Sequence, residues 1–365
     1  MNLKAIKRLL LFFSFCLGLG LYGQSNFVKN AAVNIGLHKG FLLPEYQFIN
    51  YLSQDNTHSF DLSYVKESSG KNSWEQAYNY PSLGFSFFYS TLGNDEVLGR
   101  EFAFTPFFRI NLLHLPKFSL YNQTALGVSY VTERFDLVSN FKNVAVGSHF
   151  NIHFDFRLGM KIQLLEQAQL LTGISFNHFS NANTSEPNLG LNYINYFVGL
   201  EIPFNKREEK IQIELPPHEK MIENELIYSV GGKHSRSLSS KYYFTSSLSF
   251  EKRKSFWRAL HLGIGADLFY DASIEDQLEE IGESYKSYYQ FQTGIHISQS
   301  IVYNRFSITL QEGIYLGLTE KIEQHIMYNR GIIKYWVTED FSVRFTMKSH
   351  LHILDYPEIG IGIKL

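Results

Sequence analysis

Apolar and polar residues alternate with a period of two along most of this chain, in short segments separated by turn-like breaks. Successive side chains of a β-strand point to opposite faces, so this alternation predicts strands with one apolar face. The predicted strands are 31–38, 46–52, 59–65, 82–90, 102–112, 118–128, 148–160, 168–179, 189–204, 225–232, 242–250, 259–270, 288–300, 306–318, 326–337, 341–349 and 358–365. A chain built from such segments belongs to the all-β class.

The first residues follow a different pattern, with a basic start and then an unbroken apolar run. Three basic residues precede the run at 9–19, and Gly23 is a small residue at the expected cleavage point. Residues 1–23 therefore resemble a secretory signal peptide, and the run is too short for a membrane-spanning helix. Cys16 is the only cysteine. The mature chain thus has no disulfide and no cysteine-based metal site.

The composition narrows the class of protein further. Aromatic residues make up 16% of the chain, with 23 tyrosines, 32 phenylalanines and three tryptophans. Beyond the leader, no apolar stretch is long enough to cross a bilayer as a helix. Only a closed barrel satisfies the backbone hydrogen bonds of a sheet in hydrocarbon, so these features together indicate a transmembrane antiparallel β-barrel of the outer membrane. A secreted β-sandwich is the alternative.

The net charge excludes one further class. Loss of the three basic residues of the leader changes the formal charge from −2 to −2 − 3 = −5. A dedicated nucleic-acid-binding protein would need a basic surface, so no nucleic-acid partner is expected.

The strands fall into two sets on either side of a charged segment. Residues 24–204 hold the first set, 205–220 form a charged linker or turn, and 221–365 hold the second set. The two sets look faintly alike, which is compatible with a degenerate duplication. We favour one large barrel of about 14–16 strands because it closes without two extra seams, and tandem barrels of about eight strands each are the alternative.

One predicted hairpin places chemically reactive side chains on its apolar face. By strand alternation, His178 and Ser180 share the face of Ile174 and Phe176. Asn192 lies on the apolar face of the next strand, near its start. Polar groups on a lipid-facing surface are costly, so their presence there indicates a function.

These residue types match the parts of a nucleophilic site. A serine hydroxyl becomes a nucleophile when a nearby imidazole takes its proton, so we expect Ser180 to attack and His178 to act as the base. A third group must hold the imidazole, and Asn192 can accept a hydrogen bond from it. Asn181 could donate a hydrogen bond to a developing oxyanion.

The same residues resemble the signature of a known family. The motif reads His178-Phe179-Ser180-Asn181-Ala182, followed by Pro187-Asn188 and Gly190. It is similar to that of the PagL-type lipid A 3-O-deacylases, outer-membrane barrel esterases also grouped with acyloxyacyl hydrolases. The resemblance implies His178 as general base, Ser180 as nucleophile and Asn181 as an oxyanion-region residue.

The chain departs from the family pattern at two positions. Asn192 stands where the family has a glutamate, and Asn183 stands where it has a glycine. An asparagine can orient a histidine but cannot stabilise imidazolium with a charge. Glu186 in the intervening loop could take over the role of the missing carboxylate.

The resemblance implies a substrate and its environment. The expected activity is hydrolysis of an ester-linked acyl chain of lipid A, the membrane anchor of lipopolysaccharide, without cofactor or metal. Phe176, Ile194 and Tyr196 would form the acyl groove. Expected partners are lipopolysaccharide in the outer leaflet, membrane lipids and the barrel-assembly machinery. The alternative is a porin-like or structural barrel whose esterase site is idle. The duplication would make His350 and His352 relics of a second copy of the site.

Overall fold

The computed structural model describes residues 27–44, 47–165, 167–181, 184–215, 217–234, 241–280, 282–316, 326–350 and 353–365. The predicted signal peptide at 1–23 lies outside these ranges. No helix within the described residues has the length and apolar character needed to cross a membrane.

The first barrel contains eight antiparallel strands, each paired with its neighbour in sequence. They are β1 (Ala31–Leu42), β2 (Thr57–Glu67), β3 (Ser82–Thr91), β4 (Arg100–Leu115), β5 (Phe118–Val131), β6 (Phe150–Leu165), β7 (Ala168–Ser180) and β8 (Leu191–Pro203). β8 pairs with β1 and closes the sheet. Two short helices, η1 (Gln47–Leu52) and α3 (Ser73–Ala77), lie in its connections.

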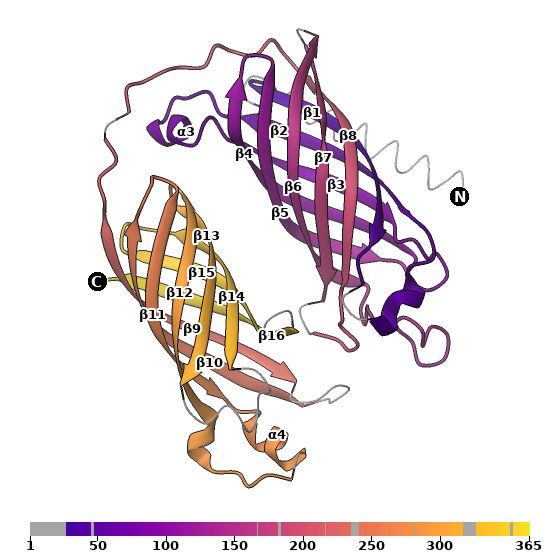
Figure 1. Ribbon diagram of the computed structural model, residues 1–365, viewed down its shortest axis with the longest axis vertical. Helices are drawn as coiled ribbons and strands as arrows, with labels where there is room; N and C mark the ends of the chain where they lie inside the picture. Colours follow the sequence, from indigo (N-terminus) through magenta and orange to yellow (C-terminus); the bar gives the residue numbers. More distant parts are fainter. Residues whose placement is uncertain are drawn as a thin grey trace.

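The second barrel is drawn in orange to yellow in Figure 1 and is closed in the same way, by pairing of its last strand with its first. Its strands are β9 (Ile222–His234), β10 (Tyr242–Ser255), β11 (Leu260–Asp271), β12 (Phe291–Tyr303), β13 (Phe306–Leu316), β14 (Met327–Trp336), β15 (Phe341–His350) and β16 (Ile353–Lys364). Two short helices, α4 (Ile274–Glu280) and η2 (Ser287–Gln290), lie between β11 and β12.

The all-β barrel class predicted from the alternation is confirmed, but the favoured single large barrel is wrong. The tandem arrangement of two eight-stranded barrels is the one found. Its physical reason is the pairing of β8 with β1, which runs from Ala32↔Pro203 to Leu42↔Tyr193. This closing pairing is about as long as the pairings between the other strands, so the first barrel has no unpaired strand edge to which β9 could add.

One predicted strand is also wrong. The segment expected at 46–52 contains the short 3-10 helix η1 instead. Ile49 and Leu52 are buried and pack against Leu92, Val97 and Leu98 at one end of the first barrel. A spacing of three residues brings two side chains to the same face of a 3-10 helix, so tertiary packing overrides the alternation here.

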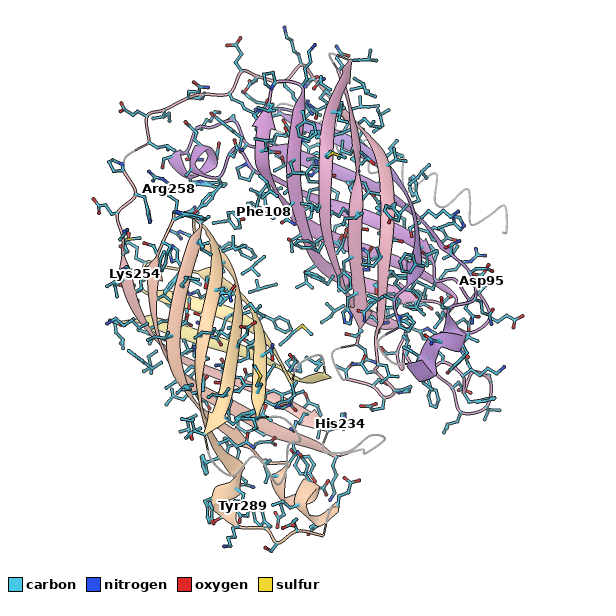
Figure 2. The ribbon with its side chains drawn as sticks, in the orientation of Figure 1. Asp95, Phe108, His234, Lys254, Arg258 and Tyr289 are labelled. Atoms are coloured by element: carbon cyan, nitrogen blue, oxygen red, sulfur yellow. The ribbon has the colours of Figure 1, made fainter. Side chains whose placement is uncertain are left out.

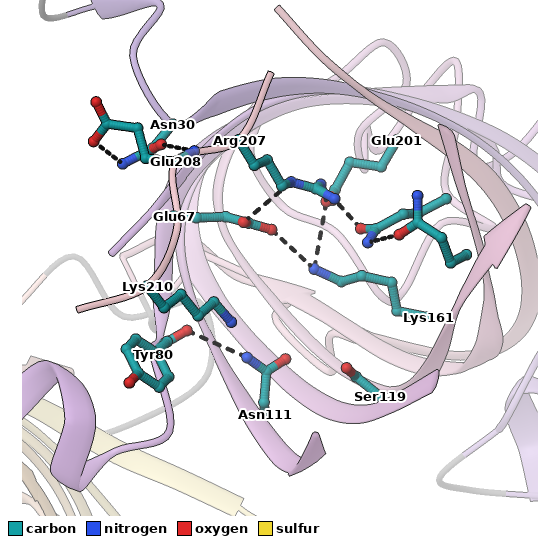
Figure 3. A network of polar contacts seen from close by, with 12 residues as sticks. Asn30, Glu67, Tyr80, Asn111, Ser119, Lys161, Glu201, Arg207, Glu208 and Lys210 are labelled. Carbon is teal, nitrogen blue, oxygen red and sulfur yellow. Dashed lines mark hydrogen bonds and ion pairs between the residues drawn. The ribbon is translucent and has the colours of Figure 1, made fainter. Parts of the chain in front are cut away.

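The interior of the first barrel is filled by charged and polar side chains. Arg157 is within 3.0 Å of Asp61, and Lys161 within 3.4 Å of Glu201. At one end, Arg207 from the segment after β8 joins this network through carboxylates of the strands (Figure 3). Apolar side chains project outward from the strands of both barrels (Figure 2), as expected of a sheet that faces lipid.

The connections tell the two ends of the first barrel apart. The chain enters at β1 and leaves from β8 at the same end, where the turns after β4 and β6 are short and only the connection after β2, which contains α3, is long. At the other end all four connections, after β1, β3, β5 and β7, are at least eight residues long. Outer-membrane barrels have short periplasmic turns and long extracellular loops, so β7 ends at the extracellular side.

Candidate active site

The hairpin of β7 and β8 brings His178, Ser180 and Asn192 to the extracellular end of the first barrel. His178 is directly paired with Asn192 across the two strands, and Ser180 is the last residue of β7. The outward face of β7 is marked by Ile174, whose side chain is 47% exposed, whereas Ser175 is buried in the interior. Alternation places His178 and Ser180 on the outward face with Ile174.

Two hydrogen bonds connect the three side chains. His178 Nδ1 is 2.7 Å from Asn192 Oδ1, and His178 Nε2 is 3.1 Å from Ser180 Oγ. Because a carbonyl oxygen only accepts, Nδ1 carries the proton and donates it to Asn192. Nε2 is then unprotonated and accepts a hydrogen bond from the serine hydroxyl. This tautomer is the one that a general base needs.

Asn181, predicted to contribute to the oxyanion region, has another role in the structure. Its backbone N–H donates to Asn188 Oδ1 at 2.9 Å, and its Nδ2 donates to the carbonyl of Ser185 at 2.6 Å. Its Oδ1 accepts from the backbone N–H of Thr184 at 3.1 Å. The side chain therefore organises the loop that follows Ser180.

The sequence predicts two further supporting residues, Asn183 and Glu186. Asn183 lies outside the described residues. Glu186 is partly buried in the loop, and this burial raises the pKa of its carboxyl group. Both ring nitrogens of His178 are already engaged, by Asn192 and Ser180. Glu186 therefore does not replace Asn192 as the group that orients the histidine.

Gly190 is a positioning residue to which sequence reasoning assigned no role beyond its place in the motif. Its φ is +70°, and its backbone N–H donates to the carbonyl of Ala145 at 3.0 Å. A Cβ at this position would lie 3.0 Å from His178 Cε1 and 3.3 Å from Ser180 Cβ. The glycine thus allows the loop to pack closely against both reactive side chains.

Replacing Gly190 by alanine should lower the rate of any reaction that Ser180 and His178 catalyse by about 10- to 100-fold, because the methyl group displaces His178 from Ser180. A matched control is Gly282, whose φ is +72° and whose added Cβ would meet nothing within 4 Å. Gly282→Ala imposes the same backbone strain and should leave the rate unchanged. Equal rates for Gly190→Ala and the wild-type protein would contradict the positioning role.

An apolar outer wall surrounds the three side chains. The predicted groove residues lie on it, with Phe176 and Ile194 paired across β7 and β8 and Tyr196 66% exposed. β6 contributes two further residues that the sequence reasoning missed. Phe154 is paired with His178, and Ile152 with Ser180. Alternation within 150–160 could have revealed their outward direction, but not the register that places them beside the site.

The second barrel does not repeat this arrangement at His350. His350 Nε2 and the hydroxyl of Tyr315 are hydrogen-bonded at 2.9 Å, and Tyr315 is buried inside the barrel. His350 therefore faces the barrel interior, unlike His178, and His352 lies outside the described residues. Within the part of the chain that the structure describes, no cluster of His, Cys, Asp or Glu is arranged to hold a metal ion.

An eight-stranded antiparallel barrel with an apolar exterior and a polar, filled interior is a transmembrane barrel, and this protein lies in the outer membrane. Residues 58–201 match the family model described as lipid A 3-O-deacylase (PagL). Residues 222–365 match the model described as acyloxyacyl hydrolase, C-terminal domain. The chain belongs to the PagL-type lipid A 3-O-deacylase family. No curated protein matches the chain.

Solved structures similar to the chain include two barrels of about half its length. The outer membrane enzyme PagL is 15% identical over 47% of this chain and 99% of that chain, with a TM-score of 0.33. Neisserial surface protein A is 11% identical over 48% of this chain and 98% of its own, also with a TM-score of 0.33. Omp33 of Acinetobacter baumannii is 8% identical over 93% of this chain and all of its own, with a TM-score of 0.18.

Proposed function

We propose that this protein is an outer-membrane serine esterase that removes an ester-linked acyl chain from lipid A. Ser180 is the nucleophile, His178 the general base and Asn192 the group that orients His178. The observation that carries this proposal is the position of His178, hydrogen-bonded to Ser180 and Asn192 on the lipid-facing wall. The protein would reach the membrane through the barrel-assembly machinery.

The family supports the substrate, since PagL proteins are described as lipid A 3-O-deacylases. Lipid A lies in the outer leaflet with its acyl chains in hydrocarbon and its sugars at the surface. An enzyme that acts on it without extracting it needs its nucleophile on the outside of a barrel, near the outer interface. Ser180 is the last residue of β7 at the extracellular end, and the wall below it is apolar.

The reaction would proceed in two steps through an acyl-enzyme. Ser180 Oγ attacks the ester carbonyl carbon while His178 Nε2 takes the hydroxyl proton. The tetrahedral intermediate collapses, the ester C–O bond breaks, and the leaving sugar oxygen receives the proton from His178. Water then attacks the acyl-serine with His178 again as base, releasing a fatty acid and restoring Ser180.

The porin-like alternative is disfavoured by the interior of the first barrel. The Arg157–Asp61 and Lys161–Glu201 ion pairs lie in its interior, and Arg207 pairs with Glu201 near its periplasmic end. Eight-stranded barrels have interiors that side chains can fill, whereas porins need more strands to enclose an aqueous channel.

The proposal is tested by producing the full chain in a bacterium with intact lipopolysaccharide and analysing its lipid A by mass spectrometry. We expect a species lighter by one ester-linked acyl group that cells carrying an empty vector lack. Identical lipid A profiles at confirmed outer-membrane levels of the protein would contradict the esterase and favour the idle barrel.

Asn192 offers a separate test of how His178 is held. Asn192→Ala should lower kcat about 10- to 100-fold, because the imidazole loses the acceptor that fixes its tautomer. Asn192→Asp keeps the length of the side chain and adds a charge that stabilises imidazolium, so its kcat should exceed that of the wild type. Full activity in Asn192→Ala would show that this hydrogen bond does not orient the base.

A further inference from the structure

The lipid-facing wall of the first barrel carries few charged residues within its described strands. Across the described strands β1–β8, outward-facing charged side chains occur at Lys39, Lys66 and Arg100. Lys66 lies at the periplasmic end of β2, and Arg100 opens β4 at the extracellular end, where it pairs with Asp95 at 3.1 Å. Lys39 lies within β1 on an otherwise apolar face.

The strand register connects Lys39 to the candidate active site. His178 is paired with Asn192, and four residues further along β8, Tyr196 is paired with Lys39. Strand rise and spacing put the Cα atoms of His178 and Lys39 roughly 17 Å apart along the barrel surface. Both therefore face the same lipid environment on adjoining parts of the wall.

Lys39 also lies near the outer interface. It is directly paired with His58, the second residue of β2, and the backbone N–H of His58 donates to Thr91 Oγ1 at 2.9 Å. The row of paired residues Tyr196, Lys39 and His58 therefore comes closer to the extracellular rim with each strand from β8 to β2. Tyr196 lies four residues deeper along β8 than Asn192, but the tilt of the strands brings its partner Lys39 back towards the rim. For strands tilted by 35–45°, Lys39 therefore lies within about 5 Å of the depth of His178 in the membrane.

The side chain of Lys39 is exposed and makes no hydrogen bond or ion pair with the described residues. An ammonium group on a lipid-facing wall is costly unless it reaches an anion or the headgroup layer. In the outer leaflet the nearest anions are the phosphates on the sugars of lipid A. A phosphate accepts charge-assisted hydrogen bonds from ammonium groups.

We propose that Lys39 binds a phosphate of the lipid A molecule whose ester is presented to Ser180. This inference rests on the proposed function and identifies how that substrate is recognised. The separation between Lys39 and His178 suits a phosphate at a distance from the reacting ester on the same two-sugar headgroup. Lys39 would thereby favour phosphorylated lipid A over a neutral lipid ester.

The surroundings of Lys39 support a headgroup contact. His58 is exposed beside it, and its ring can donate a second hydrogen bond to the same phosphate. Beyond His58 a cavity of about 470 Å³ opens at the outer rim, with Asp55 and Asp95 among its lining residues. Carboxylates repel phosphate and accept hydrogen bonds from sugar hydroxyls. The phosphate is therefore placed on the Lys39 side, and sugar on the side of the cavity.

The test measures binding without hydrolysis, in the full chain with Ser180→Ala. The probes are purified lipid A carrying its phosphates and the same lipid A after removal of its phosphates, each titrated into detergent-solubilised protein. We expect the phosphorylated form to bind about tenfold more tightly. Adding Lys39→Met should abolish this preference, and Lys39→Arg should retain it.

Lys66→Met provides the matched control, because it removes an outward-facing lysine from the opposite rim. It should leave the preference unchanged. An unaltered preference in Lys39→Met would overturn the inference, as would equal binding of both lipids to the Ser180→Ala protein. Failure of the proposed function is recognised separately, by the absence of acyl release from either lipid in the wild-type protein.

Discussion

Replacing Ser180 by alanine should lower the rate of lipid A deacylation by at least about 10³-fold, because the nucleophile that forms the acyl-enzyme is lost. Binding of lipid A should change little, since the substitution removes one oxygen atom from a residue at the end of β7. The measurement is the rate of fatty-acid release from lipid A in mixed micelles by purified protein.

Ser175 provides the matched control for this variant. It lies on the same strand but on the inward face, where its hydroxyl donates to Asn177 Oδ1 at 3.1 Å. Ser175→Ala should therefore release fatty acid at the wild-type rate. Comparable activity in Ser180→Ala, or a loss confined to Ser175→Ala, would place the chemistry inside the barrel or elsewhere on the chain.

Replacing His178 by alanine should have an effect of similar size, again about 10³-fold or more on kcat, because nucleophile and base act as a unit. The His178 ring connects the other two residues, because its Nδ1 is hydrogen-bonded to Asn192 and its Nε2 to Ser180. The double variant with Ser180→Ala should be no slower than either single variant.

His149 serves as the control for this second prediction. It also lies near the extracellular end, where its Nδ1 donates to the carbonyl of Val131 at 2.8 Å and its ring stacks on Tyr130. His149→Ala should keep wild-type kcat. If the losses in His178→Ala and Ser180→Ala multiplied in the double variant, the two residues would act independently and the proposed dyad would be refuted.

Much of the secondary structure could be predicted from the sequence, for a physical reason. The first barrel meets lipid outside and ion-paired polar groups inside, so alternation is sharp along strands such as β6 and β8. The same alternation put His178 and Ser180 on one face, and the structure finds them 3.1 Å apart between Nε2 and Oγ.

The closure of the sheets could not be predicted in this way. Alternation shows which face of a strand meets lipid, but it carries no information on which distant strand covers its edge. Whether β8 pairs with β1 or continues to β9 depends on a long-range register, and the structure selects β1. The contacts of the loop after β7 could not be predicted from alternation either. The hydrogen bonds of Asn181 depend on a turn that places Ser185 and Asn188 beside it.

The proposed mechanism requires Ser180 to be an activated nucleophile on the lipid-facing wall. The most direct measurement uses a long-chain alkyl fluorophosphonate, from which a nucleophilic serine oxygen displaces fluoride to form a stable phosphonyl ester. The purified full chain is treated in lipid vesicles and digested, and the modified peptide is identified by mass spectrometry. This mechanism predicts modification at Ser180 in the wild-type protein and strongly reduced modification in His178→Ala. An unmodified Ser180 in wild-type protein that still releases fatty acid from lipid A would contradict it.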